Sequence, residues 1–77
     1  MKKIQILGTG CPKCTTLAAH AEEAVKELGI KATIEKVEKI TDIMKFGIMT
    51  TPGLVVDGAV KSAGKVLSVD DIKKHLQ

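Results

Sequence analysis

A long amphipathic segment bounded by a proline and a glycine, with an apolar stretch on either side, most limits what this chain can fold into. Residues 2–7 predict a first strand. From Pro12 to about Leu28, apolar residues recur every three or four positions, which predicts a helix. Proline is favoured at the first helical position, and Gly29 suits the end of the helix. Residues 31–37 predict a second strand, so the unit should be right-handed with its strands parallel.

Local signals predict a short helix and a buried strand in the second half of the chain. Thr41 or Asp42 is suited to cap the helix, and Gly47 is suited to end it. Residues 54–56 are Leu-Val-Val, which predicts a buried strand.

A hairpin and a last helix complete the predicted fold. Asp57-Gly58 is typical of a type I′ turn and leads into a strand at residues 59–62. Ser68, with Asp71 three residues later, resembles a capping box that opens the last helix. The predicted order is therefore β-α-β-α-β-β-α, an α/β arrangement.

The composition favours one small globular domain, residues 1–77, and argues against several functions. The chain is 44% hydrophobic with a single aromatic residue, Phe46, so Ile, Val, Leu and Ala must build the core. The net charge is only +3, the 12 basic residues are all lysines, and they are scattered among acids, which argues against nucleic-acid binding. No stretch has the length of a signal peptide or a membrane span, so we expect a cytoplasmic protein with no membrane partner.

Both cysteines lie at the start of the long helix, in the motif Cys11-Pro12-Lys13-Cys14. With Pro12 at the first helical position, Cys11 is the N-cap and Cys14 the third helical residue. A Cys11 thiolate can accept hydrogen bonds from the first helical amides and lies at the positive end of the helix dipole, near the Lys13 cation. These features favour the thiolate, which is the reactive form of cysteine. In a reducing compartment such a pair is more often catalytic or metal-binding than structural.

The cysteine pair follows the first strand after the loop Gly8-Thr9-Gly10, at the strand end where open α/β sheets usually carry their chemistry. His20 is expected on the exposed side of the helix. A group of apolar residues is expected in the core or at the rim beneath the cysteines: Met44, Phe46, Ile48 and Met49.

Taken together, these residues resemble the thioredoxin-like superfamily, and most nearly its small, glutaredoxin-sized redox-active disulfide proteins of archaea and bacteria. Three features carry the resemblance: the Cys-x-x-C motif after the first strand, Thr50-Thr51-Pro52-Gly53 before the third, and the hairpin at 54–63 followed by a helix. The resemblance implies a thioredoxin-like or glutaredoxin-like fold, in which a central four-stranded mixed sheet is flanked by three helices.

The resemblance also implies roles for single residues. In that family the proline after the threonine is cis and packs against the disulfide, which assigns this place to Pro52. The preceding residue, Thr51, would offer backbone hydrogen bonds to an incoming peptide or thiol. Gly10, Pro12 and Lys13 would form the active-site loop.

Several positions depart from the patterns of relatives. Gly10 stands where thioredoxins usually have Trp, and Gln5 where they have a buried Asp that serves as general base. Gly64 is followed by Lys65, where glutaredoxins typically have an acidic residue that binds glutathione. A dithiol route is therefore favoured over a glutathione-dependent one.

The predicted activity is that of a protein-disulfide reductase or thiol–disulfide oxidoreductase, with Cys11 as nucleophile. Cys14, one turn into the helix and facing the core, should be less exposed and is therefore the expected resolving thiol. The expected substrates are protein or small-molecule disulfides, with a thioredoxin-reductase-like protein as a possible electron donor. We expect a monomer with no cofactor other than a redox-active Cys11–Cys14 disulfide, and no metal.

Two alternatives use the same residues. The first is a copper-chaperone type of module that binds Cu(I) through the two thiolates. Against it, Thr9 stands where such modules have Met, and the order of helices and hairpin differs. The second is an inactive thioredoxin-like interaction domain. A structural zinc site is disfavoured because four protein ligands are normal and only two cluster here.

Overall fold

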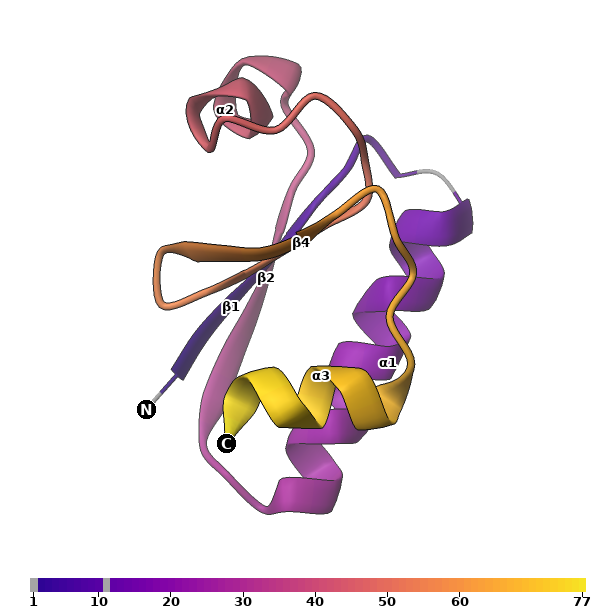
Figure 1. Ribbon diagram of the computed structural model, residues 1–77, viewed down its shortest axis with the longest axis vertical. Helices are drawn as coiled ribbons and strands as arrows, with labels where there is room; N and C mark the ends of the chain where they lie inside the picture. The colour runs from indigo at the N-terminus through magenta and orange to yellow at the C-terminus, as the bar shows by residue number, and fades with distance from the viewer. Residues whose placement is uncertain (1, 11) are drawn as a thin grey trace.

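The computed structural model describes residues 2–10 and 12–77. Its elements, in chain order, are β1 (Lys2–Leu7), α1 (Pro12–Leu28), β2 (Ala32–Val37), α2 (Ile40–Lys45), β3 (Gly53–Val56), β4 (Ala59–Ala63) and α3 (Val69–Leu76) (Figure 1). The predicted order β-α-β-α-β-β-α is confirmed.

The four strands form one mixed sheet in the order β2-β1-β3-β4. β1 and β2 are parallel, with Lys2 opposite Ala32 and Leu7 opposite Val37. β3 runs antiparallel to both β1 and β4. The parallel first pair and the four-stranded mixed sheet are therefore as expected, and the carboxyl end of β1 lies beside the start of β3.

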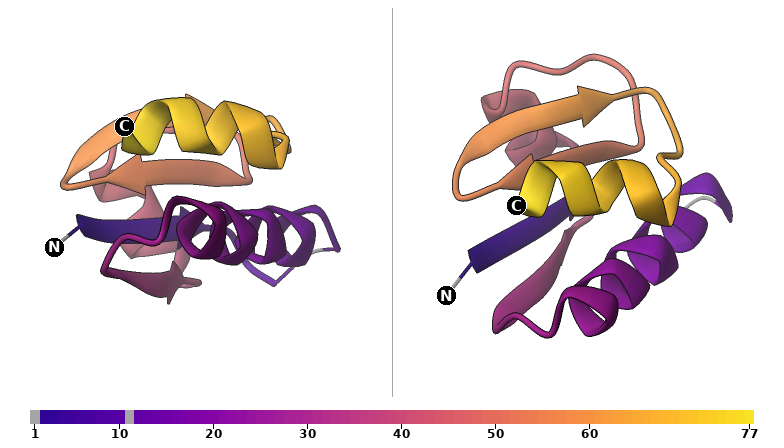
Figure 2. Two further views of the ribbon diagram at one scale, coloured as in Figure 1. Left: turned by 90° about the horizontal axis from the view of Figure 1, so that it is seen from below. Right: turned by 60° about the horizontal axis from the view of Figure 1, so that its bottom comes forward.

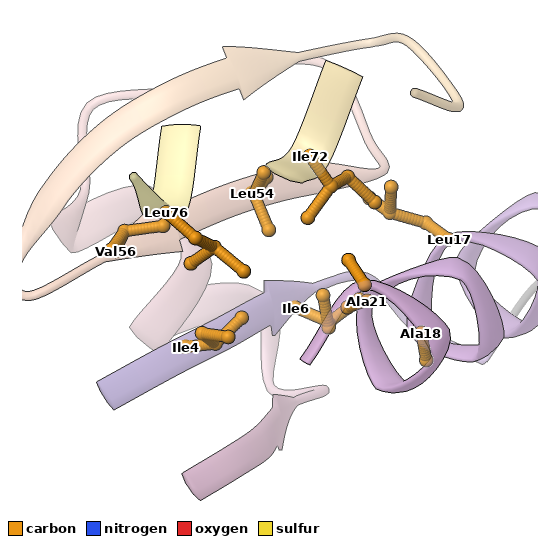
Figure 3. Close-up of a cluster of buried hydrophobic side chains, with 10 residues drawn as sticks. Ile4, Ile6, Leu17, Ala18, Ala21, Leu54, Val56, Ile72 and Leu76 are labelled. Atoms are coloured by element: carbon orange, nitrogen blue, oxygen red, sulfur yellow. The ribbon is translucent and has the colours of Figure 1, made fainter. Parts of the chain in front are cut away.

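The main hydrophobic core lies between the sheet and the two longer helices. Figure 2 shows α1 and α3 against the same face of the sheet. In Figure 3, side chains from β1, β3, α1 and α3 point toward one another. The buried residues of this core are Ile4, Ile6, Leu17, Ala18, Ala21, Ala24, Leu54, Val56, Ile72 and Leu76. The alanines of α1 allow that helix to pack closely on the sheet, because they add little bulk at the interface.

The opposite face of the sheet carries a smaller core beneath α2. Its buried residues are Leu7, Val37, Ile43, Ile48 and Val55, with Phe46 packed at the edge. β3 thus contributes side chains to both cores, and all four of its residues are buried. This agrees with the buried strand expected from the Leu-Val-Val run.

Local capping and turn signals are largely confirmed. The Ser68 hydroxyl accepts a hydrogen bond from the Asp71 N–H at 3.2 Å, as an N-cap does. Asp57 and Gly58 have φ angles of 50° and 84°, the left-handed pair that a type I′ turn requires. Gly29, with φ 64°, ends α1.

Two expectations about the helices are wrong. α2 begins at Ile40 with Lys39 as its N-cap, so Thr41 and Asp42 lie inside the first turn and no side chain caps the helix. The Ile43 N–H bonds the Lys39 carbonyl at 3.0 Å, which closes the turn earlier than the polar residues suggested. Asp42 still lies where the helix dipole favours a carboxylate, at the N-terminal end.

The second wrong expectation concerns His20, which we expected on the exposed side of α1. Its ring is partly buried, and Nδ1 lies 2.8 Å from the Leu67 carbonyl in the segment that leads into α3. The Lys73 ammonium also joins α3 to α1, donating to the Glu27 carboxylate at 3.0 Å. This hydrogen bond raises the pKa of Lys73.

Among the described residues, no helix is long and apolar enough to cross a membrane.

Candidate active site

The candidate site lies where β1 ends and α1 begins. Leu7, the last residue of β1, is paired with Gly53, the first residue of β3. This register brings the loop that follows β1 close to the segment that precedes β3. Thr9 and Thr51, which are far apart in the sequence, consequently line the same groove.

Cys14 lies on the first turn of α1 and is only 5% exposed. Its sulfur is packed against Gly8, so closely that a β-carbon at position 8 would overlap the Sγ atom. The absence of a side chain at Gly8 is therefore what makes room for the thiol. The expectation that Cys14 faces the core is confirmed, whereas Cys11, the expected nucleophile, lies outside the described residues.

The remaining residues of the predicted loop are exposed. Gly10 has a φ of 88°, a conformation that favours glycine. Pro12 and Lys13 occupy the solvent side of the first helical turn. The Thr16 hydroxyl donates to the Pro12 carbonyl at 3.0 Å and satisfies one backbone acceptor there. Because Gly10, Pro12 and Lys13 are exposed and Cys14 is buried, a molecule approaching this end of α1 would meet those three residues before Cys14.

Thr51 and Pro52 directly precede β3, whose first residue pairs with the last residue of β1. The peptide bond between them is cis, as the resemblance implied. Pro52 is fully buried, and its carbonyl accepts a hydrogen bond from the Gly64 N–H at 2.8 Å. Thr51 is exposed and lies along the groove described above. The fold therefore anchors Pro52 and leaves Thr51 facing solvent.

Sequence reasoning missed two charged residues near Cys14. A small cavity of about 40 Å³ is lined by Cys14, Gly8 and Gly10, together with Lys36 near the end of β2 and Glu38 just after it. Alternation along β2 gave a signal for Lys36, because it places this residue on the same side as Ala32 and Ile34, which pack against the main core. Glu38 follows the strand, so alternation gave no signal for it. Gln5, which stands where thioredoxins have a buried Asp, is not among the described residues that line this cavity.

An apolar groove of about 540 Å³ adjoins the site, lined by Thr9, Ile40, Ile43, Met44, Gly47, Ile48, Met49 and Thr51. Met49 is 99% exposed and Met44 66% exposed, so the expectation that they belong to the core is wrong, and both line this groove instead. Ile48 is buried, and Phe46 is half-buried. The error arose because apolar character alone does not distinguish a core residue from one on an exposed apolar surface.

The part of the chain that the structure describes holds no group of three or more His, Cys, Asp or Glu side chains placed to bind a metal ion. The two-thiolate copper alternative involves Cys11 and so falls outside that part.

Comparison with known proteins assigns the family. Residues 2–77 match the model of the thioredoxin domain family. The chain is 51% identical over 76 residues to a thioredoxin of Methanothermobacter thermautotrophicus, covering 99% of each chain. It is 42% identical over 77 residues to a thioredoxin of Methanocaldococcus jannaschii, covering 100% of this chain and 88% of that one. With its order of elements and its mixed sheet, the chain therefore belongs to the thioredoxin domain family.

Proposed function

We propose that this protein is a thiol–disulfide oxidoreductase that acts by dithiol exchange through Cys11 and Cys14. Thioredoxins are thiol–disulfide oxidoreductases, so membership of the family supports the reaction class. The observation that carries the proposal is the placement of Cys14, whose sulfur is buried against Gly8 at the end of β1. A resolving thiol belongs in such a protected position, since it must react with its neighbouring cysteine and not with solvent oxidants.

The proposed reaction has two exchange steps. The Cys11 thiolate attacks one sulfur of a substrate disulfide, a mixed disulfide forms, and the other substrate sulfur leaves as a thiolate. Cys14 then attacks the Cys11 sulfur, forming the Cys11–Cys14 disulfide and releasing the second substrate thiolate. The substrate gains two electrons, and the protein loses them. A thioredoxin-reductase-like donor would restore the dithiol.

We infer that the substrates include protein disulfides. The apolar groove reaches the site through Thr9 and Thr51, and its exposed methionines suit varied apolar segments next to a disulfide. Thr51 would hold such a segment through its backbone, and the exposed Gly10 would let it approach closely. No cofactor other than the redox-active disulfide is required.

The proposal is tested by a redox titration of the purified protein in dithiothreitol buffers, with thiols counted by alkylation and mass spectrometry. We expect one two-electron transition that involves both cysteines. Its potential should lie within the span of roughly −270 to −120 mV known for proteins of this fold.

Two results would contradict this expectation. If no intramolecular disulfide forms, dithiol exchange is excluded and an interaction domain is favoured. If the thiols become reactive only after Cu(I) is stripped from the protein, the copper-binding alternative is favoured.

A further inference from the structure

The second exchange step requires deprotonation of Cys14, and the buried position of this thiol keeps its proton away from bulk solvent. Cys14 must lose its proton in order to attack, yet it is only 5% exposed. An efficient proton acceptor lies within hydrogen-bond reach, either directly or through one water molecule. The groups that share the surroundings of the Cys14 sulfur are therefore the candidates. This inference rests on the proposed dithiol function.

The small cavity beside Cys14 offers one such group. It is lined by Ile6, Gly8, Gly10, Cys14, Thr15, Lys36 and Glu38. Its volume of about 40 Å³ exceeds the roughly 10–15 Å³ that one water needs. Among the described residues that line it, Glu38 alone carries a carboxylate.

Backbone contacts explain how Glu38 reaches this place. The Cys14 sulfur lies against Gly8. The Gly8 N–H in turn donates to the Val37 carbonyl at 2.9 Å, and Glu38 is the next residue. Cys14 therefore packs against the donor of the hydrogen bond between Gly8 and Val37, and Glu38 directly follows the acceptor.

We propose that Glu38 is the proton acceptor for Cys14 in the resolving step, acting through a water molecule in this cavity. The proton passes from the Cys14 thiol to the Glu38 carboxylate, and the Cys14 thiolate bonds to the Cys11 sulfur. The substrate sulfur leaves with the electron pair of the broken bond. Glu38 is an exposed residue, so it then returns the proton to solvent.

Lys36 is the other charged residue that lines the cavity, and it stabilises the Cys14 thiolate electrostatically. Both Lys36 and Glu38 also line a wider groove at the β2 edge of the sheet. On α1, Lys13 is exposed and is not among the residues lining the cavity.

The test is a stopped-flow reaction of the reduced protein, in excess, with dithiobis(nitrobenzoate). The first nitrothiobenzoate released reports attack by Cys11, and the second reports attack by Cys14 on the mixed disulfide. In Glu38→Gln we expect the second release to slow by at least about tenfold at pH 7, because the acceptor is gone. The difference in the rate of the second release between Glu38→Gln and the unmodified protein should narrow toward pH 10, where hydroxide removes the Cys14 proton. The first release should be unchanged.

Glu35→Gln is the matched control. It removes the same charge from β2, three residues before Glu38, but Glu35 does not line the cavity and instead pairs with Lys3 at 3.9 Å. We expect its second release to match that of the unmodified protein at every pH. Circular dichroism spectra of both variants should match that of the unmodified protein and so show that they are folded.

Two outcomes overturn the role of Glu38: an unchanged second release in Glu38→Gln, or slowing by the same factor at every pH, which indicates a structural effect. If the unmodified protein releases only one nitrothiobenzoate, Cys14 does not resolve the mixed disulfide. That result overturns the dithiol function itself.

Discussion

At the scale of single residues, the contact between Gly8 and Cys14 defines the candidate site. A helix N-terminus can present a cysteine in several directions, but here the sulfur occupies the space that a side chain at position 8 would need. The glycine is required for its lack of a β-carbon, since its φ is not among the positive values in this chain. The structural role of Gly8 therefore concerns packing and not a left-handed turn out of β1.

Gly8→Ala tests this contact. Because the added methyl group overlaps the Cys14 sulfur, we expect the free energy of unfolding to fall by about 1–3 kcal/mol. Urea unfolding followed by circular dichroism measures the change, since the chain has no Trp or Tyr for fluorescence. In a Cys14→Ala background the cost should shrink, because the sulfur is gone. An equal cost in both backgrounds would show that the methyl group meets something other than the sulfur.

At the scale of secondary structure elements, the β3–β4 hairpin is tied to β1 through its turn. The Lys3 N–H donates to the Asp57 carboxylate at 2.9 Å, and the Asp57 N–H donates to the Lys3 carbonyl at 2.8 Å. The Lys2 ammonium lies 3.7 Å from the same carboxylate. The hydrogen bond from the Lys3 backbone, followed by the charge of Lys2, lowers the pKa of Asp57.

This lowered pKa predicts a pH dependence of stability. A carboxyl whose pKa is lower in the folded state stabilises the fold above its unfolded pKa, and the contribution is lost as the pH falls through the folded pKa. Asp57→Asn keeps an oxygen acceptor and tolerates the positive φ of 50°. We therefore expect Asp57→Asn to be less stable than the unmodified protein at pH 6–7. The difference should begin to shrink as the pH falls below about 4 and should vanish only below the lowered pKa of Asp57 in the folded protein.

Urea unfolding of the two proteins between pH 2.5 and 7 measures this difference. A difference that stays constant over that range would show that the charge of Asp57 does not contribute to stability.

Elements also differ in how well the sequence predicts them. The bounds of α1 agree with the expected Pro12 and Leu28, because a proline start and a glycine end act within one turn of the chain. The start of α2 was placed two or three residues late, because its first turn is held by the Lys39 carbonyl and by the burial of Ile43, and neither is a polar capping signal.

At the scale of the whole molecule, an apolar surface lies directly beside the candidate site. The groove between the loop after β1 and α2 is bordered by Met44 and Met49, and Thr51 connects it with the cis-proline segment. A protein substrate would cover this surface, whereas a small disulfide reagent would not. The two kinds of substrate should therefore respond differently to changes in the groove.

Met49→Ser tests that difference. The side chain is 99% exposed in the free protein, so its removal should cost little stability. Covering a methionine stabilises a complex by up to about 1.5–3 kcal/mol, so we expect kcat/KM for a protein disulfide to fall by up to roughly 10- to 100-fold. The rate with dithiobis(nitrobenzoate) should be unchanged.

Val66→Ser is the control for this variant. It removes another exposed apolar residue, 37% exposed, that does not line the groove. We expect it to leave both rates unchanged. A loss with the protein substrate in both variants would indicate a general effect of surface hydrophobicity and not a docking site.

The sequence by itself determined the order of elements, most of their bounds and the inward direction of Cys14. These properties depend on signals that act over a few residues, such as Pro12 and Gly29 at the ends of α1, the Asp57-Gly58 turn and the Ser68 cap. Only the tertiary structure decided what surrounds Cys14. The approach of Glu38 depends on a hydrogen bond between Gly8 and Val37, and His20 meets Leu67 across 47 positions. Such contacts depend on how distant elements pack, and no local pattern encodes them.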